Sequence, residues 1–108
     1  MERRAQKKLG VEPSLLGFGC MRFPTVEGGA IDEEQAMAML DRAYQSGVNY
    51  FDTAYFYHNG KSEAFMGRAL ARYPRESYYL TSKLPTTLVH SLEDAKRIYA
   101  EQRERLQK

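Results

Sequence analysis

Apolar side chains recur at helical spacing in the segment 32–46. They fall at positions i, i+3, i+4, i+7 and i+8, so they share one face of a helix. Asp32 is suited to cap the start of this helix with Gln35 as its capping-box partner, and Gly47 can supply a left-handed stop. The pattern therefore predicts an amphipathic helix with a buried stripe made of Ala36, Met39, Leu40, Ala43 and Tyr44.

Two further segments show a helical pattern. In residues 62–72, Ser62 is the candidate N-cap, small residues would let the helix lie close to a sheet, and Pro74 prevents continuation. From Ser91 to the C-terminus, the pattern predicts a mostly solvent-facing helix supported by i,i+4 charge pairs. The expected stripes are Ala64, Gly67 and Ala71 in the first helix and Leu92, Ala95, Ile98, Tyr99 and Leu106 in the second, with the pairs Glu93–Arg97, Glu101–Arg105 and Glu104–Lys108.

Short apolar runs between these helices are the candidate strands. They comprise residues 15–20, 48–52 and 78–83. None shows clean two-residue alternation, which is typical of strands covered on both faces. Strands and helices thus alternate along the chain, and this order predicts right-handed crossovers and a parallel sheet of the α/β class.

Composition places the chain among ordinary globular domains. Its 108 residues suit a single domain, and 43% hydrophobic with 28% charged residues argues against a disordered chain. No apolar run is long enough to span a membrane, and the first ten residues lack the apolar core of a secretory signal. The net charge of +2 is too small to indicate a nucleic-acid partner. The single cysteine, Cys20, fits a reducing compartment, so we expect a cytoplasmic protein.

Three familiar motifs are incomplete in this sequence. Gly17-Phe18-Gly19 lacks the third glycine of a dinucleotide-binding fingerprint, because Arg22 stands in its place. Gly60-Lys61-Ser62 lacks the glycine that opens a phosphate-binding P-loop. His58 and His90 have no acidic or cysteine partner at ligand spacing, so no metal site is predicted.

Three ionisable residues are expected at the carboxyl ends of the predicted strands, where ligands bind in parallel α/β folds. Asp52 ends the second strand, Tyr57 lies in the loop after it, and Lys83 ends the third. An ammonium near a tyrosine favours the phenolate, and a carboxylate would hold that ammonium in place. Such a trio could protonate a carbonyl oxygen while a hydride reaches the carbonyl carbon. Alternatively, Asp52 caps a turn, Lys83 is a surface residue and Tyr57 has no special role.

The motifs around these residues resemble the signature of the aldo-keto reductase family. The pattern D-T-A-x-x-Y spans Asp52–Tyr57, followed by G-x-S-E at Gly60–Glu63 and G-x-A-L at Gly67–Leu70. Leu16–Arg22 resembles the first strand of that family and Leu80–Lys83 its third. The resemblance covers nearly the whole chain and implies a (β/α)8 barrel, of which this chain would form the first three βα units.

The resemblance also implies roles for individual residues. Tyr57 would be the proton donor, tuned and positioned by Asp52 and Lys83 as the other catalytic residues. Cys20, Met21 and Asp52 would lie near the nicotinamide end of NADPH. The reaction would be the NADPH-dependent reduction of an aldehyde or ketone to an alcohol, with a small carbonyl compound as substrate and no metal ion.

The sequence also departs from the family pattern. The family has a further catalytic histidine at the end of a fourth strand, and neither His58 nor His90 lies at such a place. Because this histidine and the late strands and loops that contact the cofactor phosphate in the family are missing, we expect little or no catalysis by this chain alone. Three βα units also cannot close a barrel. Open sheet edges would favour self-association.

Other functional hypotheses therefore stay open beside a reductase. The chain could be a non-catalytic regulatory or assembly module, or a truncated segment without independent function. Its sequence also resembles a bacterial branch of the family whose longer members carry a C-terminal iron–sulfur segment.

Overall fold

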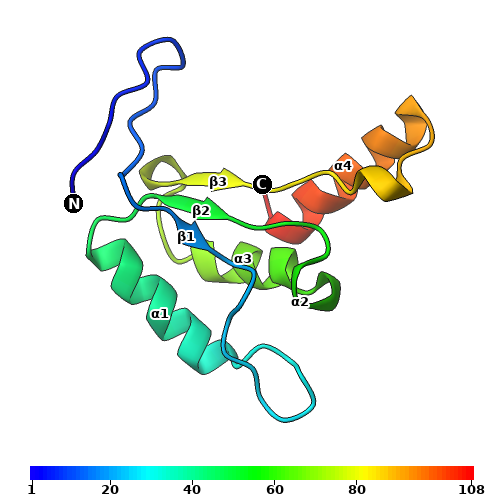
Figure 1. Ribbon diagram of the computed structural model, residues 1–108, viewed down its shortest axis with the longest axis horizontal. Helices are drawn as coiled ribbons and strands as arrows, with labels where there is room; N and C mark the ends of the chain where they lie inside the picture. Colours follow the sequence, from blue (N-terminus) through cyan, green and yellow to red (C-terminus); the bar gives the residue numbers. More distant parts are fainter.

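Three short parallel strands form the centre of the fold in the computed structural model, which describes all residues, 1–108 (Figure 1). They are β1 (Phe18–Gly19), β2 (Tyr50–Asp52) and β3 (Tyr79–Thr81), adjacent in sequence order. Each lies inside one predicted strand, so the parallel βαβ arrangement is confirmed, although the strands are shorter than predicted. Because β2 is central, β1 and β3 are the edge strands, and self-association through them stays a prediction.

The sheet is packed on one face only, which suits three βα units that cannot close a barrel, although the lack of alternation in the strand runs is typical of two covered faces. Phe51 in β2 is fully buried among core residues, while its neighbours Tyr50 and Asp52 point to the opposite face and are only half-buried. Leu80 pairs with Phe51 and packs against the same core. The opposite face therefore leaves polar side chains accessible at the strand ends.

Four α-helices and two 3-10 turns connect and follow the strands. Helices α1 and α3 pack against each other along one side of the sheet, and α4 packs on α3 (Figure 1). None of these helices has the length and apolar character needed to cross a membrane. Their bounds are α1 Glu33–Gln45, α2 Tyr57–Gly60, α3 Ser62–Leu70, η1 Arg75–Ser77, η2 Thr86–Leu88 and α4 Leu92–Leu106.

Of the two predicted N-caps, one is confirmed and one is wrong. The Asp32 carboxylate accepts a bond from the Gln35 backbone N–H at 3.2 Å. Ser91, for which no cap was predicted, caps α4 by accepting a bond from the Asp94 backbone N–H at 3.1 Å. The prediction of Ser62 as a cap is wrong: Lys61 occupies the cap position of α3, and Ser62 lies inside the helix. Its hydroxyl is engaged elsewhere, as described below.

Helix α3 buries a different face from the one predicted. Its fully buried side chains include Phe65, Met66, Ala69 and Leu70, whereas Ala71 is exposed. The prediction of a buried face made only of small residues is wrong, because the sheet, α1 and α4 cover α3 from several sides at once. Only Gly67 of the predicted stripe is buried and makes a close contact.

Helix α4 buries a narrow stripe of Ile98, Gln102 and Leu106 at i, i+4 and i+8. Leu92 and Tyr99, predicted to share the buried face, are 71% and 59% exposed. Of the three predicted charge pairs, only Glu101–Arg105 forms. Arg97 pairs with Asp94 in place of Glu93, and Lys108 lies over the Tyr78 ring and not beside Glu104.

Residues 1–14 form an antiparallel ribbon that the apolar pattern did not predict. Bridges join Arg3 to Ser14 and Gln6 to Val11, and the ribbon protrudes from the amino ends of the strands (Figure 1). Asn49, just before β2, fastens it: the Asn49 Oδ1 atom accepts a bond from the Ser14 N–H at 2.6 Å. These contacts lie away from the carboxyl ends of the strands, where the candidate site is found.

Candidate active site

The ammonium of Lys83 is hydrogen-bonded to both of the other residues that the sequence singled out, Asp52 and Tyr57. Its Nζ atom lies 2.8 Å from Asp52 Oδ2 and 3.2 Å from the Tyr57 hydroxyl oxygen. A third bond, 2.8 Å long, runs to the backbone carbonyl of Thr53. The structure therefore brings Asp52, Tyr57 and Lys83 together, with Thr53 as a fourth partner that the sequence did not reveal.

The register of the parallel sheet explains why Asp52 and Lys83 meet. Asp52 is the last residue of β2 and is paired with Thr81, the last residue of β3. Lys83 follows two residues later, so both side chains leave the sheet at the same edge. A hydrogen bond of 2.8 Å from the Thr53 N–H to the Thr81 carbonyl extends the ladder beyond the strands and fixes this edge.

Tyr57 is the first residue of α2 and is followed directly by a left-handed turn. His58 and Asn59 both have φ 54°, and Gly60 has φ 81°. Such backbone angles are uncommon for residues other than glycine. The turn is held by His58, whose Nε2 accepts a bond from the Phe23 N–H at 2.9 Å and whose ring stacks on that of Phe23. Burial lowers the pKa of His58, which favours the neutral imidazole that can accept this bond.

The electrostatics of the cluster keep Lys83 charged. Partial burial lowers the pKa of the Lys83 ammonium. The hydrogen bonds to Asp52 and Tyr57 together raise this pKa by more than burial lowers it, so the net shift is upward. The Lys83 and Asp52 side chains are 49% and 36% exposed, so solvent screens the pair and its contribution to stability is small. The arrangement therefore presents a fixed positive charge to the Tyr57 hydroxyl.

Cys20 and Met21 take opposite orientations at the end of β1. The Cys20 side chain is fully buried with its Sγ 3.6 Å from Met66 Sδ, whereas Met21 is 48% exposed. Any contact of Cys20 with a cofactor at this edge would come from its backbone. Burial, reinforced by the negative charge of Asp52, raises the pKa of the Cys20 thiol to about 12.

We expect the Cys20 thiol to react slowly with iodoacetamide in the native chain. With a pKa near 12, the reactive thiolate at pH 8 is about 10³-fold scarcer than for an ordinary cysteine. Mass spectrometry of the alkylated protein measures this rate. Labelling in denaturant provides the control, and equal native and denatured rates would contradict the buried position of Cys20.

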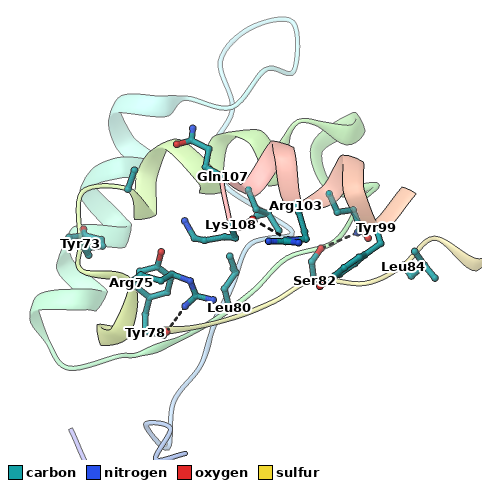
Figure 2. Close-up of a pocket in the computed structure, with 13 residues that line it drawn as sticks. Tyr73, Arg75, Tyr78, Leu80, Ser82, Leu84, Tyr99, Arg103, Gln107 and Lys108 are labelled. Carbon is teal, nitrogen blue, oxygen red and sulfur yellow. Dashed lines mark hydrogen bonds between the residues drawn. The ribbon is translucent and has the colours of Figure 1, made fainter. Parts of the chain in front are cut away.

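The largest cavity lies away from this cluster. A cleft of about 890 Å³ lies between η1, β3 and α4, and Figure 2 shows the side chains that line it. Neither Asp52, Tyr57 nor Lys83 lines it. Its walls combine apolar and aromatic side chains with cations, among them Tyr78, Leu80, Tyr99, Leu106, Arg75, Arg103 and Lys108. The candidate active site is thus the accessible edge formed by the strand ends.

The chain is similar to proteins of one family. The model described as "Aldo/keto reductase family" matches residues 15–108. Versiconal hemiacetal acetate reductase from Aspergillus parasiticus is 35% identical over 78 residues, which are 68% of this chain and 23% of that relative. The chain spans about a quarter of the length of the curated relatives it matches.

Solved structures share the arrangement of strands and helices. An aldo-keto reductase from Bacillus halodurans in its holo form has a TM-score of 0.80 and 30% identity, over 100% of this chain and 37% of that chain. An aldo-keto reductase from Klebsiella pneumoniae in complex with NADPH shares the fold, with a TM-score of 0.78 and 21% identity, over 100% and 36%. The chain therefore belongs to the aldo/keto reductase family of oxidoreductases and corresponds to the first βα units of its (β/α)8 barrel.

Proposed function

We propose that this chain carries the proton-transfer part of a carbonyl reductase site, with Tyr57 as the proton donor. The observation that supports it most is the 3.2 Å hydrogen bond between Lys83 Nζ and the Tyr57 hydroxyl, in a chain of the aldo/keto reductase family. Asp52 holds the ammonium from its other side at 2.8 Å. The substrate class is a small aldehyde or ketone.

The chemistry of the cluster suits this role. Reduction of a carbonyl group places negative charge on its oxygen, and the Tyr57 hydroxyl would neutralise that charge by donating its proton. The phenolate that remains faces the Lys83 ammonium, which stabilises it. Asp52 keeps the lysine both charged and in place. Water then returns a proton to Tyr57, and the alcohol leaves.

NADPH is the proposed source of the hydride that reaches the carbonyl carbon. At the ends of β1 and β2, the exposed side chain of Met21 offers an apolar thioether, and the half-buried side chain of Asp52 offers a hydrogen-bond acceptor. This pair of groups fits the ring and carboxamide of a nicotinamide. Met21, Asp52 and the backbone of Cys20 would hold that end of the cofactor beside the Tyr57 hydroxyl.

A hybrid enzyme tests this proposal. Residues 15–108 replace the matching segment of the Bacillus halodurans reductase, and oxidation of NADPH is followed with a reactive aldehyde. We expect aldehyde-dependent turnover by the hybrid and little or none by the isolated chain, assayed in parallel. A folded hybrid with no turnover would contradict the reductase proposal and favour a non-catalytic module.

A further inference from the structure

The first turn of α3 is hydrogen-bonded to the residue that follows each of the three strands. Ser62 and Glu63 are consecutive and both fully buried. Three residues are their partners: Cys20, Thr53 and Ser82 come directly after β1, β2 and β3. One helical turn is therefore hydrogen-bonded to all three strand ends at the edge of the sheet that carries the candidate site.

Ser62 connects α3 to the ends of β1 and β2. Its Oγ lies 2.7 Å from Thr53 Oγ1 and donates a longer bond, 3.4 Å, to the Cys20 carbonyl. Thr53 is the residue whose carbonyl accepts a bond from Lys83 Nζ. The position of that acceptor is thus set from within the core by Ser62.

Glu63 connects α3 to the end of β3 and to α4. Its Oε2 accepts bonds from Ser82 Oγ at 2.6 Å and from Gln102 Nε2 at 2.9 Å, and Arg105 lies 3.4 Å from Oε1. A fully buried carboxylate is tolerated only when its oxygens are paired and hydrogen-bonded. Glu63 therefore imposes a fixed geometry on each of these donors.

Gln102 completes the link to Lys83. The same Nε2 group that binds Glu63 also donates a 2.8 Å bond to the backbone carbonyl of Lys83. A longer contact of 3.5 Å to Ser82 Oγ is drawn in Figure 2. The backbone of Lys83 is thus held at its own carbonyl and, through Ser82, one residue earlier.

We propose that Ser62, Glu63 and Gln102 are positioning residues that hold Lys83 against Asp52 and Tyr57. They fix the backbone on both sides of the ammonium, at Thr53 after β2 and at Ser82–Lys83 after β3. Their importance for catalysis rests on the proposed function, whereas their control of the Lys83 position does not.

A purely structural role would give a different result. In that case, removing one of these hydrogen bonds would lower the stability of the fold but leave the Lys83 side chain in its place. A positioning role also moves the ammonium away from Asp52 and Tyr57. The pKa of Lys83 separates the two, because both hydrogen bonds raise it.

The experiment is an NMR titration of the Lys83 side chain in the whole 108-residue chain. The signal is assigned with Lys83→Arg. Gln102→Met keeps the volume but removes all three bonds from Nε2. Ser62→Ala removes the bonds to Thr53 and to the Cys20 carbonyl. Glu63→Gln removes the buried charge. We expect the titration midpoint of Lys83 to fall in each variant toward about 10.4, the ordinary lysine value.

Arg68→Gln is the matched control. Arg68 also belongs to α3, but its ion pair with Glu33, 3.0 Å long, is exposed and runs to α1. We expect the wild-type Lys83 midpoint in this variant. Unchanged midpoints in folded Gln102→Met and Ser62→Ala would overturn the proposal, and so would an equal fall in Arg68→Gln. If Glu63→Gln does not fold, these two variants decide the question.

The titration measures no turnover, so its outcome is independent of the reductase proposal. A hybrid enzyme without activity together with a lowered Lys83 midpoint would reject the proposed function and retain the positioning role. An active hybrid with unchanged Lys83 midpoints would retain the proposed function and reject the positioning role.

Discussion

Tyr57→Phe in the hybrid enzyme is expected to lower kcat for aldehyde reduction by about 10²–10⁴-fold, the usual contribution of a positioned general acid. Phenylalanine keeps the ring, whose centroid lies 4.8 Å from Lys83 Nζ, but removes the hydroxyl that would deliver the proton. Binding of NADPH should not change, because the hydroxyl acts on the substrate oxygen. Absorbance at 340 nm gives the rate, and a fluorescence titration gives the NADPH affinity.

Tyr55→Phe is the control for this prediction. The Tyr55 hydroxyl points to α4, where it bonds to Glu101 Oε1 at 3.2 Å, so its loss should leave kcat at the wild-type value. Equal losses in Tyr55→Phe and Tyr57→Phe would mean that the site responds to general damage. A Tyr57→Phe enzyme with the wild-type kcat would exclude this residue as the proton donor.

Gly67→Ala is expected to destabilise the fold, although alanine is the better helix former by about 1 kcal/mol. Helix α3 crosses the end of α4 at Gly67, where an added Cβ would overlap the Arg105 carbonyl oxygen and lie 2.9 Å from the Leu106 carbonyl carbon. These are backbone atoms, so one helix must move. Overpacking of this kind costs about 1–3 kcal/mol, which exceeds the gain in helix propensity. A lower midpoint of urea unfolding measures the effect.

The displacement should extend beyond the contact itself. Leu106 and Gln102 lie on the buried stripe of α4, so moving this helix also strains the bonds from Gln102 to Glu63 and Lys83. Gly19→Ala is the control, because a Cβ there meets no atom within 4 Å. An unchanged or raised midpoint for Gly67→Ala would show that the two helices do not cross so closely.

The meeting of Asp52 and Lys83 could be predicted from the sequence because it depends on a local rule. In a parallel sheet, residues at the carboxyl ends of neighbouring strands share one edge. Once residues near 52 and 83 are placed at strand ends, their proximity follows. The position of Tyr57 follows less directly, since it depends on left-handed angles at His58 and Asn59 that no sequence pattern indicated.

The buried environment of α3 could not be predicted for a different reason. A single apolar stripe assumes that a helix is covered from one side, whereas α3 contacts the sheet, α1 and α4. The prediction of Ser62 as a cap is therefore wrong, and the complete burial of Glu63 could not be predicted. The partner that gives Glu63 its role, Gln102, lies 39 residues away, and only the packed structure brings the two together.

The titration of Lys83 in the unmodified chain tests the central claim most directly. If Asp52, Lys83 and Tyr57 form one hydrogen-bonded unit, the pKa of the Lys83 ammonium lies above that of an ordinary lysine, and Asp52→Asn lowers it by removing the 2.8 Å ion pair. Side-chain NMR of labelled lysine between pH 8 and 12 measures both values. We predict a raised midpoint in the wild type and a lower one in Asp52→Asn. A wild-type midpoint at or below about 10.4, unaffected by Asp52→Asn, would contradict the account.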